Sequence, residues 1–359
     1  MPNSRPAALE VFAPIEDRPL LLALRALKLG DILVAAPALK GLARTFDDHA
    51  VVFAGPAWLV PIARLVPGIR ALLPTKGLDD PLAIEPGLVD IAANLHGNGP
   101  ESRGLIAALN AREVIQHAPG DGMKGVIRRD PREPEWLDGI HERTRWVRLV
   151  NAFGVDARDT DVGILTPSAP PLASDAVVIH VGAFYGSRQW PVDRFAVVAR
   201  ARAAEGDTVV ITGGEADRER ARAVVRASGL PAEAMLAGRL ALDELAALIA
   251  AARLVITADT GAAHLASAYG TPSVVIFGPA PVEEWGPPPG PHIALTNASL
   301  RRGETFASEP DPALLAVTAD DVLEAAQRLA QRLTQPADDI TRRTTPRRRA
   351  ATGGGRASR

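Results

Sequence analysis

The chain has 359 residues, a formal net charge of −2 and no cysteine. This length suits two ordinary domains with a sizeable buried core, and the lack of cysteine excludes disulfides and thiolate metal sites. No run of 18 uncharged apolar residues occurs, so the sequence predicts no transmembrane helix, and its first residues lack a secretory signal pattern. We therefore expect a globular protein located in the cytoplasm.

Short apolar segments alternate with helical ones through the first half of the chain. We expect strands at 20–25, 51–54, 69–73, 89–95 and 112–116, and helices at 32–44, 57–65, 102–109 and 136–153. This rhythm predicts a parallel sheet with right-handed crossovers. Pro37 either kinks the first of these helices or begins a restarted one.

A proline-rich segment at 166–171 interrupts the rhythm and marks the best domain boundary. Strands are expected again at 176–181, 209–212, 253–257 and 273–277, and an amphipathic helix at 320–333. We therefore predict an α/β protein of two doubly wound Rossmann-like domains that face a cleft. The predicted parts are an N-terminal domain at 18–165, a linker at 166–175 and a C-terminal domain at 176–335.

The end of the chain has a different composition. Residues 341–359 hold seven arginines and no acidic residue. Such a segment cannot offset its ordering entropy by burial, so we expect 336–359 to form a disordered basic tail. A solvated tail is the favoured interpretation, and contact with the anionic inner face of a membrane is the alternative. We expect no nucleic-acid partner, because the rest of the chain is acidic.

The most informative stretch runs from Leu254 to Ala268. A β-branched apolar strand ends at Asp259, turns through Thr260 and Gly261, and enters a helix of small residues. The free N–H groups at such a helix start favour a phosphate, and Gly261 permits close approach. The stretch therefore predicts a diphosphate site at the carboxyl end of a strand, where open α/β sheets bind nucleotides.

Other short motifs stand at comparable strand ends. They are Gly30-Asp31, His96-Gly97-Asn98-Gly99, Ser187-Arg188-Gln189-Trp190-Pro191, Gly213-Gly214-Glu215 and Leu236-Ala237-Gly238. Taken alone, Asp31 is best interpreted as a helix N-cap, Arg188 as a solvated loop residue and Trp190 as packing. A plain glycine turn and a ligand-binding loop explain His96 and Asn98 equally well.

In this order and spacing, the motifs resemble glycosyltransferase family 9, the heptosyltransferase family, over about residues 20–295. The resemblance implies the GT-B arrangement of two Rossmann-like domains. It also implies an inverting, metal-independent transfer of a sugar from a nucleotide-diphosphate donor to a hydroxyl of a glycan or lipid-linked acceptor. The donor implied by the family's name is ADP-heptose, which is a substrate, and no cofactor is expected.

The resemblance implies roles for individual residues as well. Asp31 becomes the candidate general base, and Arg188 stands where the family usually has the lysine that contacts the donor's phosphate. Candidate donor-binding residues are Gly182, Ser187, Gly213, Gly214, Glu215, Gly238, Leu240, Asp259, Thr260, Gly261, Ala262 and His264. Candidate acceptor-binding residues are Gly30, His96 and Asn98.

Asp159-Thr160-Asp161 matches the Asp-x-Asp metal motif of another class of glycosyltransferase. It follows a helix near the domain boundary, and the sequence offers no third oxygen ligand nearby, so we expect no metal site. Two other functions stay open: a sugar-nucleotide epimerase or hydrolase of the same fold, and a non-catalytic nucleotide- or glycan-binding protein. An epimerase or hydrolase would consume the donor without an acceptor.

Overall fold

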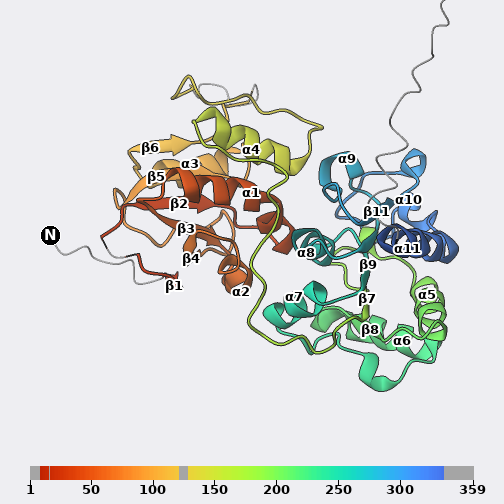
Figure 1. Cartoon of the computed structure of the whole chain (residues 1–359). Helices are drawn as coiled ribbons and strands as arrows, with labels where there is room; N and C mark the ends of the chain where they lie inside the picture. Colours follow the sequence, from red (N-terminus) through yellow and green to blue (C-terminus); the bar gives the residue numbers. More distant parts are fainter. Residues whose placement is uncertain (1–8, 16, 121–127, 335–359) are drawn as a thin grey trace, which may run out of the picture.

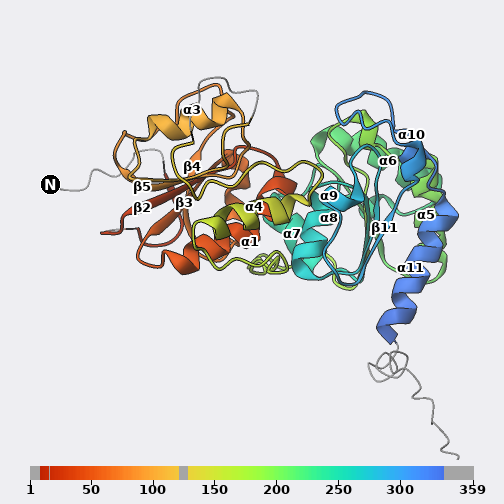
Figure 2. The same ribbon diagram turned by 90° about the horizontal axis from the view of Figure 1, so that it is seen from above.

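The protein, described here by a computed structural model, consists of two α/β halves that lie side by side (Figure 1). The structure describes residues 9–15, 17–120 and 128–334. We call residues 9–152 the N-terminal half and residues 177–334 the C-terminal half. Each half contains one mainly parallel sheet with helices on both faces (Figure 2), which confirms the predicted pair of Rossmann-like units.

The sheet of the N-terminal half has the strand order β1-β4-β3-β2-β5-β6. Its strands are β1 (Glu10–Val11), β2 (Leu20–Leu24), β3 (Ala50–Gly55), β4 (Ile69–Pro74), β5 (Val89–Asn94) and β6 (Glu113–Ile115). Its helices are α1 (Leu29–Thr45), α2 (Val60–Ala63), α3 (Pro100–Ala108) and α4 (Glu142–Ala152). Among the described strands of this sheet, only β1 runs antiparallel to its neighbour. Strand β2 is central and all its side chains are buried, as expected for a parallel strand covered on both faces.

The sheet of the C-terminal half has the order β11-β10-β9-β7-β8, and all its strands are parallel. The strands are β7 (Val177–His180), β8 (Val209–Thr212), β9 (Leu254–Ala258), β10 (Ser273–Ile276) and β11 (His292–Leu295). The helices are α5 (Val192–Ala204), α6 (Arg218–Ser228), α7 (Leu242–Ala250), α8 (Gly261–Tyr269), α9 (Val282–Trp285), α10 (Pro312–Leu315) and α11 (Ala319–Thr334). Short 3₁₀ turns lie at Ala57–Leu59, Gly186–Arg188, Glu215–Asp217, Ala232–Ala234 and Ala298–Leu300.

Both sheets change their winding direction beside their first parallel strand. Strand β2 lies between β3 and β5 in the N-terminal half, and β7 lies between β8 and β9 in the C-terminal half. Such a switch point leaves a crevice at the carboxyl ends of the strands, where open α/β sheets bind their ligands. The segments that follow β2, β5, β7 and β9 are therefore where a site is expected.

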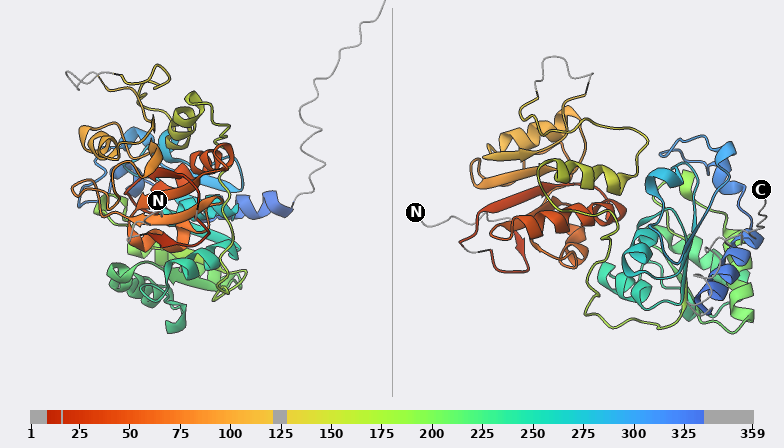
Figure 3. Two further views of the ribbon diagram at one scale, coloured as in Figure 1. Left: turned by 90° about the vertical axis from the view of Figure 1, so that its left-hand side faces the viewer. Right: turned by 45° about the horizontal axis from the view of Figure 1, so that its top comes forward.

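The two halves share one apolar core. Helix α1 contacts α8, and α2 contacts α7. Ile62 of α2, Leu248 of α7 and Leu265 of α8 are all fully buried within this core. Helix α11 packs against α5 at the far side of the C-terminal half (Figure 3), so it takes no part in this contact.

The expected strands are all present, but two expected helices differ. The helix expected at 136–153 begins only at Glu142, because Gly139 has a left-handed backbone (φ +69°) and the His141 ring caps the helix by accepting from the Arg143 N–H. The segment 57–65 forms a 3₁₀ turn followed by the single turn α2. Helix α1 runs through Pro37 without interruption, so a helix restarted there is wrong.

The predicted linker at 166–175 contains no helix or strand. The predicted tail at 336–359, with its possible membrane contact, lies outside the described residues. Within the described ranges, no helix is both long and apolar enough to cross a membrane.

Candidate active site

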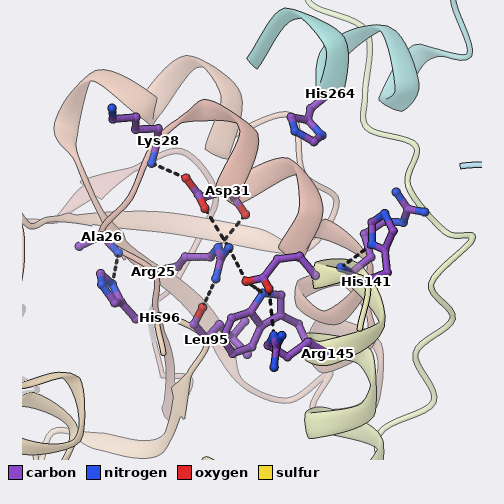
Figure 4. Close-up of polar contacts among 12 residues, drawn as sticks. Arg25, Ala26, Lys28, Asp31, Leu95, His96, His141, Arg145 and His264 are labelled. Atoms are coloured by element: carbon purple, nitrogen blue, oxygen red, sulfur yellow. Dashed lines mark hydrogen bonds and ion pairs between the residues drawn. The ribbon is translucent and has the colours of Figure 1, made fainter. Parts of the chain in front are cut away.

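The first turns of α1 and α8 pack against each other, one from each half of the molecule. A Cβ atom added to Gly30 would lie 2.7 Å from Cδ2 of His264, and one added to Gly261 would lie 2.6 Å from Cδ2 of Leu29. This close approach requires glycine at both positions. The Gly-Asp element after β2 and the Asp-Thr-Gly-x-x-His element after β9 therefore meet between the halves, with His264 above the start of α1 (Figure 4).

Asp31 occupies the third position of α1, so the N-cap interpretation is wrong. The helix begins earlier than expected, and its N-cap is Lys28, whose backbone N–H donates to Asp31 Oδ2 at 3.0 Å. Arg25 Nη2 donates to the other oxygen, Oδ1, at 3.0 Å. The Asp31 side chain is 19% exposed. Its carboxylate is thus held in place by two donors and is still accessible to a substrate.

Arg25 is a site residue that the sequence reasoning missed. Its side chain is 1% exposed, and its Nε donates to the Asp31 carbonyl at 2.8 Å. Its guanidinium also donates to the Leu95 carbonyl and to Glu142 Oε1. The sequence signal was present, because an arginine directly after the buried strand β2 needs partners inside the fold.

His96 lies at the end of β5, the neighbour of β2 at the switch point. Its Nδ1 accepts from the Ala26 N–H at 3.1 Å, which places the ring beside the turn that leads to Asp31 (Figure 4). Burial, helped by the nearby Arg25, lowers the pKa of His96 to about 4. The ring is therefore neutral near pH 7 and, with Nδ1 accepting, carries its proton on Nε2.

Asn98, the third candidate for acceptor binding, is already engaged within the N-terminal half. Its amide nitrogen donates to the Ala118 carbonyl at 2.8 Å, and its Oδ1 accepts from Arg103 at 3.2 Å. These bonds fix the loop that follows His96, so Asn98 holds this loop in shape.

Arg188 is paired with Asp259 and is not a solvated loop residue. Its Nη1 lies 3.0 Å from Asp259 Oδ2 and donates to the Asp259 carbonyl at 3.1 Å. The Asp259 residue is 2% exposed, whereas the Arg188 side chain is 24% exposed. The buried carboxylate thus orients the guanidinium at the start of α8 and leaves part of it accessible.

Helix α8 begins as the sequence predicts, with Thr260 as the N-cap in an extended conformation and Gly261 as the first helical residue. The Thr260 side chain forms no capping bond to the helix; its hydroxyl bonds the Thr257 hydroxyl at 3.1 Å. The first amides of α8, including that of Ala262, are thus not satisfied by a capping side chain. A helix start of this kind suits an anion.

His264 is buried in the first turns of α8. Its Nε2 lies 3.8 Å from Asp259 Oδ1, and its ring meets Trp285 edge to face. Burial lowers the pKa of His264 to about 4, so the ring is neutral near pH 7. It packs against Gly30 as a spacer between the halves.

The glycines after β7 and β8 gather around Asp217, a residue that the sequence reasoning also missed. The Gly214 N–H donates to Asp217 Oδ2 at 2.8 Å. A Cβ atom at Gly182 would lie 2.6 Å from the same oxygen, and one at Gly213 would lie 2.8 Å from Asp217 Cβ. Gly238 completes the group, since it has φ +66° and its N–H donates to the Gly213 carbonyl.

Three other donor-binding candidates, Glu215, Leu240 and Ser187, do not belong to the group around Asp217. The Glu215 side chain is 75% exposed and pairs with Arg218. Leu240 is half-buried against the shared core. Ser187 is 1% exposed, and its hydroxyl donates to the Thr305 carbonyl, so this hydroxyl is used within the protein. Trp190 is fully buried with its indole N–H on the Val317 carbonyl, which confirms it as packing.

A lysine–aromatic contact also joins the two halves. Lys28 Nζ lies 3.3 Å from the ring centroid of Phe184 and 4.3 Å from that of Tyr185. Phe184 is 79% exposed and belongs to the loop between β7 and Arg188. The contact therefore reaches from the N-cap of α1 to the loop that carries Arg188.

The Asp-x-Asp motif is engaged with groups of the protein. Asp161 pairs with Lys40 and with Arg44, and Asp159 accepts from the Thr144 hydroxyl at 3.1 Å. Among the described residues, no group of three or more histidine, cysteine, aspartate and glutamate side chains could hold a metal ion.

Known heptosyltransferases match this chain both in sequence and in fold. The model of glycosyltransferase family 9 (heptosyltransferase) matches residues 153–307. Lipopolysaccharide heptosyltransferase 2 of Escherichia coli (strain K12) is 34% identical over 102 residues, which are 27% of this chain and 29% of that protein. This alignment thus spans less than a third of that relative's length.

Longer matches cover both halves. Lipopolysaccharide heptosyltransferase 1 of Pseudomonas aeruginosa is 28% identical over 285 residues, which are 70% of this chain and 76% of that protein. The solved structure of E. coli ADP-heptose LPS heptosyltransferase II superposes with a TM-score of 0.70 at 19% identity, over 88% of this chain and 99% of that chain. The likeness of the structures confirms the predicted two-domain GT-B fold.

Proposed function

We propose, from the premise that this chain belongs to glycosyltransferase family 9, that it transfers heptose from ADP-heptose to a hydroxyl of a glycan or lipid-linked acceptor with inversion at the anomeric carbon. The names of its relatives support this donor and suggest a lipopolysaccharide acceptor. The observation that carries the proposal is the packing of Gly30 against His264, because it brings Asp31 and the start of α8 to the same place.

Asp31 is the general base of the proposed reaction. It takes the proton of the acceptor hydroxyl while the hydroxyl oxygen attacks the anomeric carbon and the bond to the diphosphate breaks. Its carboxylate is accessible, and it lies in the first turn of α1, beside the contact of α1 with α8.

Arg188 and the first amides of α8 are the groups that stabilise the leaving diphosphate. Arg188 is oriented by Asp259, and the amides from Gly261 onward lie at the positive end of the helix. Fixed donors and a cation at the site of developing negative charge perform the electrostatic task of a metal ion. The glycines after β7 and β8 let the Asp217 side chain lie close to the strand ends of the same sheet, where open α/β sheets bind nucleotides.

The experiment is a transfer assay with ADP-heptose and a heptose-free lipopolysaccharide core acceptor. We expect heptosylated acceptor and ADP in equal amounts, with the anomeric configuration of the new bond, read by NMR, opposite to that of the donor. Release of heptose from the donor in the absence of acceptor would indicate a hydrolase. Binding of ADP-heptose without turnover would indicate a non-catalytic binding protein.

A further inference from the structure

A buried guanidinium lies directly beneath the carboxylate of Asp31. Arg25 is 1% exposed, and each of its nitrogens has a partner: Nε binds the Asp31 carbonyl, Nη1 binds the Leu95 carbonyl, and Nη2 lies 3.0 Å from Asp31 Oδ1 and 3.2 Å from Glu142 Oε1. A buried cation is tolerated only when it is paired and fully hydrogen-bonded. Arg25 therefore has one fixed orientation, and Asp31 is part of what fixes it.

Glu142 holds Arg25 from the other side. Its Oε1 also accepts from the indole N–H of Trp146 at 3.0 Å, and its Oε2 accepts from Arg145 Nε at 2.9 Å. The Arg25 guanidinium lies over the Trp146 ring, 4.7 Å from its centroid. Helix α4 thus supplies a rigid second carboxylate that shares the charge of Arg25 with Asp31.

The two hydrogen bonds that the Asp31 carboxylate accepts leave each of its oxygens able to accept another. Oδ1 accepts from Arg25 and Oδ2 accepts from the Lys28 N–H, so each oxygen has used one of its two lone pairs. Figure 4 labels the charged and titratable groups Arg25, Lys28, His96, His141, Arg145 and His264 around this carboxylate, and Glu142 pairs with Arg25. Burial lowers the pKa of all three histidines, to about 4 for His96 and His264, so these two rings are neutral near pH 7. Lys28 Nζ lies over the Phe184 ring, and Arg145 pairs with the other oxygen of Glu142, so Arg25 is the charged side chain that contacts Asp31 and Glu142 is the carboxylate that shares it.

We propose that Arg25 and Glu142 form a positioning pair for the catalytic base: Arg25 orients the Asp31 carboxylate, and Glu142 holds Arg25 in place and offsets part of its charge. This inference rests on the proposed function. Neither residue touches the substrate in this scheme. Both act through Asp31, since a hydrogen bond to a carboxylate favours its charged form and a second carboxylate on the same cation weakens that effect.

The two residues should shift the pH dependence of transfer in opposite directions. In Arg25→Met, we expect the acid limb of the kcat/KM profile to move to higher pH and kcat to fall roughly tenfold to a hundredfold, as for a misplaced catalytic group. In Glu142→Gln, we expect the acid limb to move to lower pH, because the full charge of Arg25 then falls on Asp31. Arg25→Lys should recover part of kcat, since it restores the cation without the planar fork.

The control is Arg202→Met in α5. Arg202 is also largely buried and paired with a buried carboxylate, that of Asp207, but it lies away from both helix starts. We expect a comparable loss of melting temperature with an unchanged kcat and an unchanged pH profile. The KM for the donor should stay within about threefold in all these variants, because none of them removes a proposed donor contact.

The variants in an Asp31→Asn background give the decisive comparison. If Arg25 acts through Asp31, adding Arg25→Met to Asp31→Asn should change the residual rate by less than twofold. A further tenfold loss, or pH profiles that move in the same direction in Arg25→Met and Glu142→Gln, would overturn the inference. If Arg25→Met does not fold, Glu142→Gln decides the question, because the inference requires its acid limb to move to lower pH and an unchanged profile would overturn it.

Failure of the proposed function has a different signature. It would appear as no transfer by the unaltered protein, or as undiminished transfer by Asp31→Asn. Loss of transfer in Asp31→Asn with an additive effect of Arg25→Met would leave the function standing and overturn the positioning pair alone.

Discussion

In the proposed reaction, the Asp31 side chain serves both the helix α1 and the chemistry. Its Oδ2 accepts from the Lys28 N–H and so satisfies one of the free donors at the start of α1, while Oδ1 is tied to Arg25. A bond to each oxygen fixes the plane of the carboxylate. An exposed edge remains for the acceptor hydroxyl, as the 19% exposure of the side chain indicates.

The substitution Asp31→Asn separates these two tasks. Asparagine keeps the size of the side chain and one oxygen for a hydrogen bond, but it cannot take a proton. We expect kcat to fall by roughly 10²–10⁴ with little change in donor affinity. Turnover and ADP-heptose binding should be measured at a matched fraction of folded protein, judged by melting temperature. Near-normal turnover would contradict the assignment of Asp31 as the base.

The burial of the His264 ring makes the folding stability of the protein depend on pH. Its pKa is about 4 in the folded protein, whereas an unfolded histidine binds a proton near pH 6.5. The stability contributed by the neutral, buried ring is therefore fully present above pH 6.5 and is lost as pH falls toward 4, at about 1.4 kcal/mol per pH unit. Melting temperatures measured between pH 7 and 4 should fall less steeply for His264→Gln than for the unaltered protein. Equal slopes would mean that this ring is not buried in its neutral form.

At the scale of elements, the contact between α1 and α8 depends on two glycines. In Gly30→Ala the new methyl group meets the His264 ring, and in Gly261→Ala it meets Leu29, both closer than 3 Å. We expect each substitution to cost roughly 1–3 kcal/mol of stability through overpacking and to reduce transfer by separating the two helix starts. Chemical denaturation and the transfer assay measure the two effects.

Gly104 is the matched control, because it lies inside α3 with open space where a Cβ atom would be. Gly104→Ala should leave transfer unchanged and raise stability by about 0.4–1 kcal/mol. A loss of transfer in the control, or normal transfer in both Gly30→Ala and Gly261→Ala, would show that the close contact is not needed.

The sequence predicted the elements well because their signals are local. The apolar run before Asp259 and the small residues after it are enough to place β9 and α8. The start of α1 was predicted wrongly. Only four residues separate Leu24 from this helix, so Lys28 is its N-cap, where Asp31 was expected. The partners of Arg25 could not be predicted, because Glu142 comes from a helix far along the chain whose packing depends on the whole fold.

At the scale of the whole molecule, the charges that the proposed mechanism needs are all supplied by side chains and backbone groups of the protein. Arg188 and the start of α8 face the proposed diphosphate site, whereas Asp161 is neutralised by Lys40 and Arg44. We therefore expect transfer to continue in excess EDTA at close to its full rate. The rate should be compared with that after Mg²⁺ or Mn²⁺ is restored. Loss on chelation and recovery with metal would contradict the metal-independent mechanism.

The contact of the two first turns has a consequence for how the halves respond to a ligand. Two helices whose positive ends lie together repel each other weakly, and an anion between them turns this repulsion into attraction to a shared counter-charge. Binding of ADP should then tighten the junction of the halves, and its effect on melting temperature should weaken as salt is raised. The nucleotide would act as the electrostatic linker that joins the two halves into one cooperative unit.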